Sequence, residues 1–410
     1  MNGVERDRLD GHRLRALVFT SIAHFLNDSF LVTMSILIDY YISMKVSALF
    51  LGAMAALVNV LSGLASPVIS SYADRKGLHN ALMLVGFALI GASSLVLAAS
   101  FVSTGLLRPI EIGLGSALLG LGLSFYHPLG GAILQRAYEG KAGPALGING
   151  SLGSLGRALF PFIMVMAIRA MGGGLALSVI GVYVFVVASI VHAGLKPIRM
   201  PSTNETRAQS AARLSGYYYA LVPLTIVIFI RAMFMSGVMT YMPTYVDSEV
   251  HSKVLMSVIV TASYATAIVG QPFFGWLVGR IGGRNVIVLT TVASTVSYIA
   301  FLLVSGAYAI TALLALYSFF AMSGFPVLLG YVSEVVGPEA RAQANSLVWG
   351  IGNTVGGAVG ILVGGALVGR QEVNLVVRAS GLMAAMWVFA IFALASTALL
   401  FLIPEGRVSR

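Results

Sequence analysis

Twelve long apolar runs, separated by short polar or turn-rich breaks, constrain this chain more than any other feature of its sequence. A helix needs roughly 20 apolar residues to cross the hydrocarbon core of a bilayer, which is about 30 Å thick. The runs do not alternate and are rich in Gly and Ala, which favours helices over the strands of a barrel. We therefore predict an all-α integral membrane protein. Its transmembrane helices are expected at 16–43, 48–72, 81–103, 110–136, 144–170, 175–195, 217–245, 254–278, 285–305, 308–333, 342–368 and 379–403.

Composition excludes several classes of function. Charged residues make up only 10% of the chain and hydrophobic residues 58%, whereas a soluble domain carries about 25% charged residues. The absence of cysteine excludes disulfides, thiolate metal sites and cysteine nucleophiles. The net charge of +10 is scattered over short loops, so no nucleic-acid partner is expected. We find no phosphate-binding glycine loop and no nucleophile–base set, and we expect neither an enzyme nor a cofactor.

The longest polar interruption divides the chain near its middle. Residues 196–216 predict a cytoplasmic linker between an N-terminal six-helix bundle (1–195) and a C-terminal six-helix bundle (217–410). With both termini in the cytoplasm, most Lys and Arg residues fall on the inner side, as the positive-inside rule requires. A multi-pass protein of a prokaryotic plasma membrane is the expected setting, and the N-terminus shows no removable signal peptide.

The two halves repeat each other. The sequence SSYADRKGLHN (70–80) corresponds to GWLVGRIGGRN (275–285), and aligning Gly77 with Gly282 also aligns Arg75 with Arg280. FYHPLGG (125–131) likewise corresponds to GFPVLLG (324–330). Two pseudo-symmetric six-helix bundles suit a transporter that rocks about a central site.

The turn after the second helix resembles the signature loop of the major facilitator superfamily, G-x-x-x-D-R-x-G-R-R. The first copy matches at Asp74, Arg75 and Gly77, with Ser70 in place of the leading glycine and Leu78–His79 in place of the basic pair. The second copy matches at Gly275, Arg280, Gly282 and Arg284, with Gly279 in place of the acid.

Four further stretches are similar to fosmidomycin-resistance-type efflux proteins of this superfamily. They are IAHFLND (22–28), SFYHPLGGA (124–132), GINGSLGSLGRALFP (147–161) and FIRAMFMSGVMTYMPTY (229–245). The resemblance implies the major facilitator fold, alternating access, and a cavity lined by the first, fourth, seventh and tenth helices. The arginine that many facilitators carry in the fourth helix is absent, with Ser116 at the corresponding position, which questions the usual scheme of proton coupling.

Charges inside a bilayer are costly and usually functional, so the ionisable residues within the spans are the first candidates. Asp28 lies near the middle of the first helix, and His24 lies one turn before it on the same face. We predict that Asp28, His24 and His127 handle protons. Two structural alternatives remain: Asp28 and Asn27 hold the first helix to a neighbour, and His127 bonds a carbonyl freed by Pro128.

Arg157 and Arg231 lie mid-span in the fifth and seventh helices and, with Asn27, are the predicted substrate contacts. A guanidinium suits a carboxylate, phosphonate or phosphate ester, and either arginine could instead be the counter-ion of Asp28. Two central arginines and one central acid leave at least one arginine unpaired, which favours an anionic or zwitterionic substrate; the alternative is a pair with Asp28 together with a cluster of helix-end carbonyls. No metal site is predicted, because the two histidines lack a third ligand.

The inner turns supply the predicted gating residues: Asp74, Arg75, Gly77 and Arg136 in the first half, and Gly275, Arg280 and Arg284 in the second. A carboxylate such as Asp74 can lie at the positive N-terminus of a facing helix and hold the inner side shut. The alternative is that Arg75 and Lys76 serve topology only. The second copy, which lacks an acid at 279, should latch more weakly.

We expect a twelve-helix secondary transporter that exports a small amphipathic or anionic compound in exchange for protons. Proton-coupled uptake of an organic anion or sugar is the first alternative, and a membrane sensor or scaffold is the second. Because one chain contains both halves of a transport path, a monomer should suffice.

Overall fold

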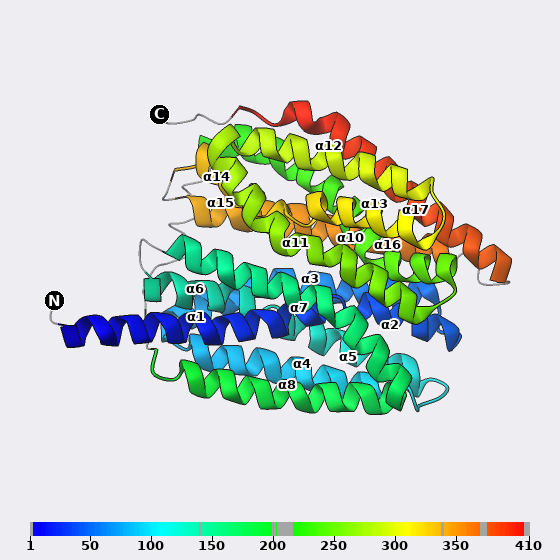
Figure 1. Cartoon of the computed structure of the whole chain (residues 1–410), viewed down its shortest axis with the longest axis horizontal. Coiled ribbons are helices and arrows are strands. Elements are labelled where there is room, and N and C mark those ends of the chain that lie inside the picture. Colours follow the sequence, from blue (N-terminus) through cyan, green and yellow to red (C-terminus); the bar gives the residue numbers. More distant parts are fainter. Residues whose placement is uncertain are drawn as a thin grey trace. The chain divides into compact units, whose positions relative to one another are not determined.

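The structure is a computed structural model that describes residues 3–138, 142–198, 200, 202, 216–337, 340–369 and 375–405. Its regular elements are all helical in this part of the chain (Figure 1). In the first half they are α1 (Gly3–Leu31), α2 (Thr33–Ser43), α3 (Ala48–Lys76), α4 (His79–Ser100), α5 (Leu107–Leu123), α6 (Tyr126–Tyr138), α7 (Ala142–Met171) and α8 (Gly173–Leu195). In the second half they are α10 (Tyr218–Val250), α11 (Lys253–Ile281), α12 (Gly283–Leu302), α13 (Ala307–Ala321), α14 (Gly324–Val335), α15 (Arg341–Leu347), the π-helix η3 (Val348–Val355), α16 (Gly356–Gly369), α17 (Leu375–Ala398) and the 3₁₀-helix η4 (Leu399–Leu402).

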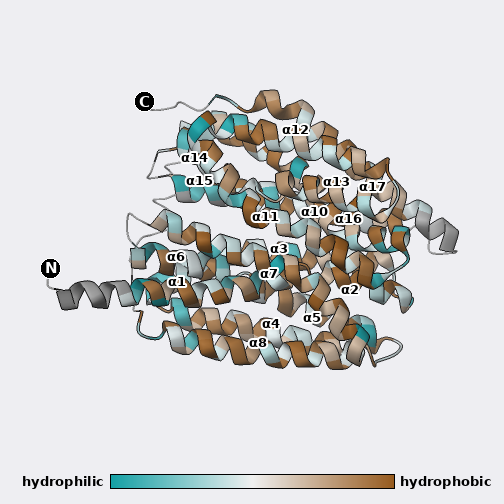
Figure 2. Ribbon diagram, viewed as in Figure 1, coloured by the Kyte–Doolittle hydropathy of each residue, from teal (hydrophilic) through white to brown (hydrophobic). Residues whose placement is uncertain are grey.

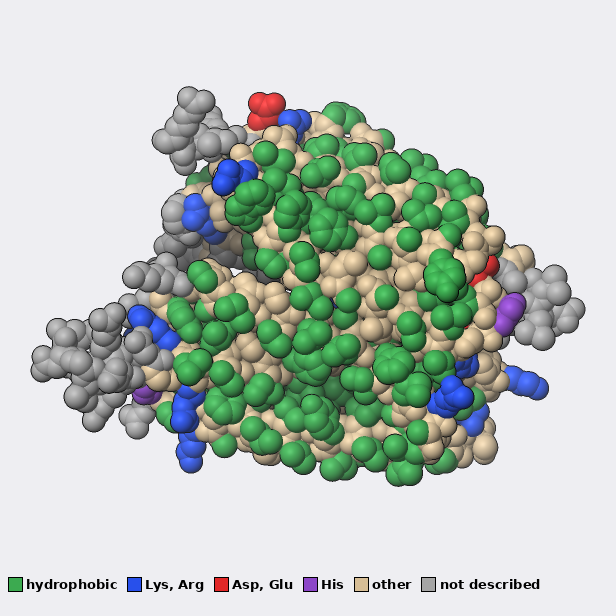
Figure 3. All heavy atoms as spheres, viewed as in Figure 1, with side chains coloured by type: hydrophobic (Ala, Val, Ile, Leu, Met, Phe, Trp, Pro, Cys, Tyr) green, Lys and Arg blue, Asp and Glu red, His purple; other side chains and the backbone are tan. Residues whose placement is uncertain are grey.

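The predicted fold class is confirmed. Within the described residues, twelve helical stretches are long and apolar enough to cross a membrane, from Gly11–Ser43 to Ser380–Leu402. Apolar residues run along the helices and polar residues gather near their ends (Figure 2). Hydrophobic side chains spread over the viewed surface, and the visible Lys and Arg side chains lie near helix ends (Figure 3). The protein is therefore a multi-pass membrane protein.

The chain forms two compact units. Unit 1 comprises residues 1–31 and 61–205, and unit 2 comprises 32–60 and 206–410. In unit 1, α1 packs against α7, and α4 packs against α5 and α8. In unit 2, α10 packs against η3 and α16, and α12 packs against α13 and α17. The same pairs of spans thus meet in both units, as duplicated halves should.

Unit 2 also contains α2 and the beginning of α3. Here α2 packs against α10, and the Asn59 side-chain amide donates a 3.1 Å hydrogen bond to the carbonyl of Thr354. The predicted linker, 196–216, lies mostly outside the described residues. The division into bundles at 1–195 and 217–410 stays a prediction.

Spans four and ten are each built from two helices rather than one. Span four breaks between α5 and α6, and span ten breaks between α13 and α14. Pro128 and Pro326 are the third residues of the helices that follow these breaks. Proline is tolerated in the first helical turn because its missing N–H has no partner there. The repeated sequence thus produces the same break in both units.

Glycines allow close helix contacts in each unit. In unit 1, a Cβ on Gly156 of α7 would collide with the backbone carbonyl of Phe25 on α1. In unit 2, a Cβ on Gly360 of α16 would collide with the backbone carbonyl of Met233 on α10. Small residues let transmembrane helices approach in this way, so α7 lies directly against the face of α1 that carries the central charges.

Candidate functional site

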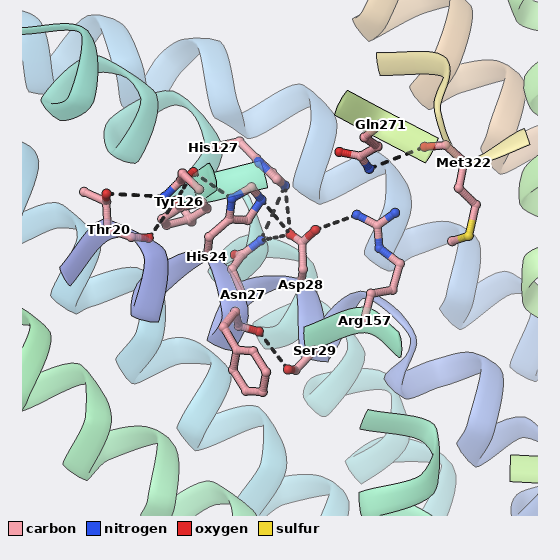
Figure 4. A network of polar contacts seen from close by, with 12 residues as sticks. Thr20, His24, Asn27, Asp28, Ser29, Tyr126, His127, Arg157, Gln271 and Met322 are labelled. Carbon is pink, nitrogen blue, oxygen red and sulfur yellow. Dashed lines mark hydrogen bonds and ion pairs between the residues drawn. The ribbon is translucent and has the colours of Figure 1, made fainter. Parts of the chain in front are cut away.

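The core of unit 1 contains a network of polar contacts around Asp28 (Figure 4). The Asp28 side chain is only 1% exposed, and His24 lies one helical turn before it on α1. The two side chains meet as their spacing predicts, with His24 Nε2 at 3.5 Å from Asp28 Oδ1. Gly153 of α7 makes room for the imidazole of His24, because a Cβ there would overlap the ring.

His127 joins Asp28 from another span. It is the second residue of α6, directly after the break in span four. Its Nε2 atom lies 3.4 Å from Asp28 Oδ1, and its side chain is 50% exposed. His127 is thus an accessible imidazole beside a buried carboxylate.

Arg157 of α7 provides the counter-ion of Asp28. Its Nη2 atom lies 2.5 Å from Asp28 Oδ2, and hydrogen bonds between a guanidinium and a carboxylate are stronger than those between neutral groups. The sequence left open which arginine would pair with the acid. In unit 1 it is the one from the fifth span, and Ser116 is buried in α5.

Asn27 belongs to the same cluster. Its side chain is fully buried, and its Nδ2 atom donates a 3.2 Å hydrogen bond to Asp28 Oδ1. The same atom lies 3.5 Å from His127 Nε2. Asn27 thus links the carboxylate of α1 to the histidine of α6. These contacts agree with the structural alternative, in which Asn27 and Asp28 hold the first helix to a neighbour.

A second layer of polar groups, which the sequence analysis did not single out, holds His24. His24 Nδ1 lies 2.8 Å from Asn149 Oδ1, and the Tyr126 hydroxyl lies 3.0 Å from the same oxygen. Tyr126 also donates to the backbone carbonyl of Thr20 at 2.8 Å. The sequence feature that could have indicated this layer is Asn149, the single side-chain amide within the glycine-rich stretch 147–161.

The cluster also has the composition of a metal site. Ligand atoms of His24, Asp28 and His127 all lie within 4.8 Å of one another. The reason for expecting no metal site, the lack of a third ligand, is therefore wrong: Asp28 is the third. Arg157 disfavours a metal ion here, however, because its guanidinium already contacts the other oxygen of Asp28 and would repel a second cation.

Arg231 lies in unit 2 and has a different environment. It is 7% exposed, and its Nη2 atom donates a long 3.4 Å hydrogen bond to the carbonyl of Ala321. Its Nε atom is buried without a hydrogen-bond partner. Among the described residues, no carboxylate forms an ion pair with this guanidinium.

The inner turn of unit 1 connects α3 to α4. Gly77 adopts a positive φ of 66°, which favours glycine at this position. Asp74 Oδ1 lies 3.0 Å from Nε2 of the buried His79. Asp74 is the acid of the signature loop, and His79 stands where that loop has a basic residue. Arg75 and Arg136 are exposed at the ends of α3 and α6.

The corresponding turn of unit 2 connects α11 to α12. Both carboxylate oxygens of Glu334 accept hydrogen bonds from the N–H of Gly283, at 2.8 and 3.0 Å. Gly283 is the first residue of α12, so Glu334 places negative charge at a helix N-terminus. Glu334 was not among the predicted site residues, and 51 positions separate it from Gly283 in the chain.

The other predicted residues of this turn have local partners. Arg284 donates through Nε to the carbonyl of Ile403 at 2.8 Å, and its Nη1 atom lies 3.4 Å from Glu405. The Arg280 guanidinium lies 5.0 Å from the centre of the Trp276 ring. Gly275 lies on α11, where its Cβ would make only an ordinary contact with Pro326.

An ion cluster near the ends of α2, α10 and α11 was also missed. Lys253, the first residue of α11, pairs with Asp39 of α2 and lies 3.2 Å from Asp247 Oδ2 of α10. Its ammonium also lies 4.8 Å from the ring centre of Tyr40.

Known proteins resemble this chain over nearly all of its length. The fosmidomycin resistance protein of Escherichia coli (strain K12) is 22% identical over 382 residues, which cover 91% of each chain. The uncharacterized MFS-type transporter YfnC of Bacillus subtilis (strain 168) is 25% identical over 409 residues, covering 96% of this chain and 94% of YfnC. The predicted relation to the fosmidomycin-resistance group is confirmed.

Solved structures share the fold. A bacterial homologue of the human lysosomal transporter Spinster, inward-facing and unoccupied, has a TM-score of 0.76 and 14% identity, covering 96% of this chain and 97% of that one. A mutant of the nucleoside transporter NupG has a TM-score of 0.75 and 15% identity, covering 96% of this chain and 100% of that one. The model of the Major Facilitator Superfamily matches residues 17–249 and 224–410. The chain therefore belongs to the major facilitator superfamily, a family of small-molecule transporters and not of enzymes.

Proposed function

We propose that this protein is a secondary active transporter that exports a small amphipathic or anionic compound in exchange for protons. The observation that carries the proposal is the buried Asp28 carboxylate, which contacts one permanent cation and two imidazoles. Few groups in a membrane protein combine such burial with partners that can themselves gain or lose a proton.

The proposed coupling step is the transfer of a proton to the Asp28 carboxylate. Protonation removes the negative charge that holds Arg157, so the link between α1 and α7 weakens. The proton enters through His127, whose side chain is 50% exposed, and Asp28 releases it on the opposite side after the units have moved. A charged and a neutral Asp28 thus stabilise different conformations.

Substrate binding is assigned to Arg157, Arg231 and Asn27. Export is favoured over uptake by the relation to a protein named for fosmidomycin resistance, which is 22% identical. Arg157 takes part in coupling as well, because an anionic substrate and Asp28 would compete for its guanidinium.

The inner turns are the proposed gates. The gating residues are Asp74, Arg75, Gly77 and Arg136 in unit 1, and Gly275, Arg280 and Arg284 in unit 2. Local contacts already order both turns, and we propose that they latch the cytoplasmic side. We place the protein as a monomer in a prokaryotic plasma membrane, with both termini in the cytoplasm.

Proteoliposomes that contain a pH-sensitive dye test this function. We would screen phosphonates, organic anions, sugars and cationic drugs for compound-triggered proton movement. Wild-type protein should respond to one class, and Asp28→Asn should lose the response. Glu249→Gln, which neutralises an exposed acid near the end of α10, is the matched control and should respond normally. Proton movement that persists in Asp28→Asn would exclude the coupling role of Asp28.

A further inference from the structure

The two central arginines have opposite electrostatic environments. Arg157 in unit 1 contacts the Asp28 carboxylate at 2.5 Å. Arg231 in unit 2 is 7% exposed, and it donates a long 3.4 Å hydrogen bond to the Ala321 carbonyl. An uncompensated buried charge is strongly unfavourable. The surplus cation of the sequence is therefore Arg231.

Arg231 also lies against the start of a helix. A Cβ on Gly324, the first residue of α14, would lie 2.8 Å from Arg231 Nη1. No side chain caps this helix, because the hydroxyl of the preceding Ser323 donates to the carbonyl of Phe319 at 2.8 Å. The first turn of a helix carries partial positive charge on its free N–H groups.

These two positive features reinforce each other. The carbonyl of Ala321, the last residue of α13, offsets part of the guanidinium charge at 3.4 Å. The first turn of α14 adds positive charge, so an anion between the guanidinium and this turn would be stabilised by both. The buried Nε of Arg231 lacks a partner, and so does the buried hydroxyl of Tyr317 on α13, which lies close enough to Arg231 for electrostatic interaction. Buried donors without partners are rare in native structures. Both donors need an acceptor, and an anionic oxygen would also neutralise the charge of Arg231.

We propose that Arg231 and the first turn of α14 bind the anionic oxygen group of the transported compound, a carboxylate or a phosphonate. The inference rests on the proposed transport function and deepens it. Of the proposed substrate contacts, Arg231 is thus the one whose charge has no carboxylate partner among the described residues, whereas Arg157 is already paired with Asp28. Gly324 is required because any side chain there would fill the space beside the guanidinium.

A set of six-carbon ligands that differ only in head group tests this site. Purified full-length protein in a neutral detergent is titrated with hexanoate, hexylphosphonate, hexanamide and hexylamine. The shift in the thermal unfolding midpoint gives an apparent affinity for each. Hexanoate or hexylphosphonate should raise the midpoint of the wild type, and hexanamide at the same concentration should not. Equal shifts with hexanamide, or no shift with either anion, would overturn the proposal.

Variants then locate the anion. Arg231→Met should weaken the apparent affinity at least tenfold, Arg231→Lys should weaken it less, and Gly324→Ala should weaken it with the charge retained. Arg169→Gln, at an exposed arginine of α7, and Gly279→Ala, where a Cβ meets nothing within 4 Å, are the matched controls and should bind as the wild type. If Arg231→Met fails to fold, Arg231→Lys and Gly324→Ala decide, and wild-type affinity in both contradicts the site.

Stability without ligand separates a binding role from a structural one. If Arg231 binds ligand and has no internal counter-ion, its replacement in Arg231→Met should not lower the unfolding midpoint; if Arg231 is structural, the replacement should lower it.

The proteoliposome assay separates this proposal from the transport function. Proton movement that needs Asp28 but persists with the same anion in Arg231→Met retains the coupling and refutes the site. Anion binding that needs Arg231, without any proton movement, retains the anion site and refutes the coupling.

Discussion

Arg157 and Asp28 are 129 residues apart in the chain, yet their side chains meet at 2.5 Å in the core of unit 1. The ion pair joins α1 to α7 beside Gly153 and Gly156 of α7, where a Cβ would collide with atoms of α1. It also fixes the carboxylate between a permanent cation and two histidines. A change in the charge of Asp28 is therefore felt directly in the packing of two helices.

The first prediction concerns the coupling of these two residues. Asp28→Asn leaves Arg157 without its counter-ion, and Arg157→Gln leaves Asp28 to the histidines alone. Each should destabilise the protein, and the double variant should be less destabilised than the sum, with a coupling energy of about 0.5–3 kcal/mol. Unfolding of purified protein in mixed micelles measures all four species. Strict additivity would show that the pair contributes nothing to stability.

Glu334 should stabilise the start of α12. Glu334→Ala removes both acceptors from the N–H of Gly283 and should cost about 0.5–2 kcal/mol of unfolding free energy. Glu334→Gln keeps one oxygen and should cost less. Glu405→Gln is the control, because Glu405 is 87% exposed in its pair with Arg284. A loss in Glu405→Gln that equals the loss in Glu334→Ala would contradict the capping role.

The cluster at Lys253 should depend on its central cation. Lys253→Met leaves two carboxylates without their shared partner, one of which, Asp39, is only 3% exposed. We expect a loss of about 1–3 kcal/mol, measured by thermal denaturation. Asp39→Asn should be milder because Lys253 keeps Asp247 at 3.2 Å. Lys45→Met, at an exposed lysine beyond the end of α2, should change little, and a reversed order would argue against this cluster.

Gly156 should tolerate no side chain. Gly156→Ala places a methyl group against the carbonyl of Phe25, so α7 must move away from α1 at a cost of about 1–3 kcal/mol. Gly147→Ala, in the same helix with open space around it, is the control and should be neutral or slightly stabilising. Chemical unfolding monitored by circular dichroism compares the two. Similar stabilities would show that the helices separate there without cost.

Local properties of the sequence were enough to predict most of the fold. An apolar run in lipid must satisfy its backbone within itself, so length and composition alone predict the twelve spans. The four-residue spacing of His24 and Asp28 places both on one face of one helix. The repeated proline turns at Pro128 and Pro326 are also local, and both units show the same broken span.

The partners of the central charges depended on tertiary structure. In the sequence, Arg157 and Arg231 are equivalent mid-span arginines, and either suits Asp28 equally. Only the packing of α7 against α1 decides between them, and that packing follows from helix shape at Gly153 and Gly156. The contacts of Asn149, Glu334 and Asp39 were hidden for the same reason. Sequence spacing sets which side chains share a helix face, but only the approach of a second helix decides which of them meet.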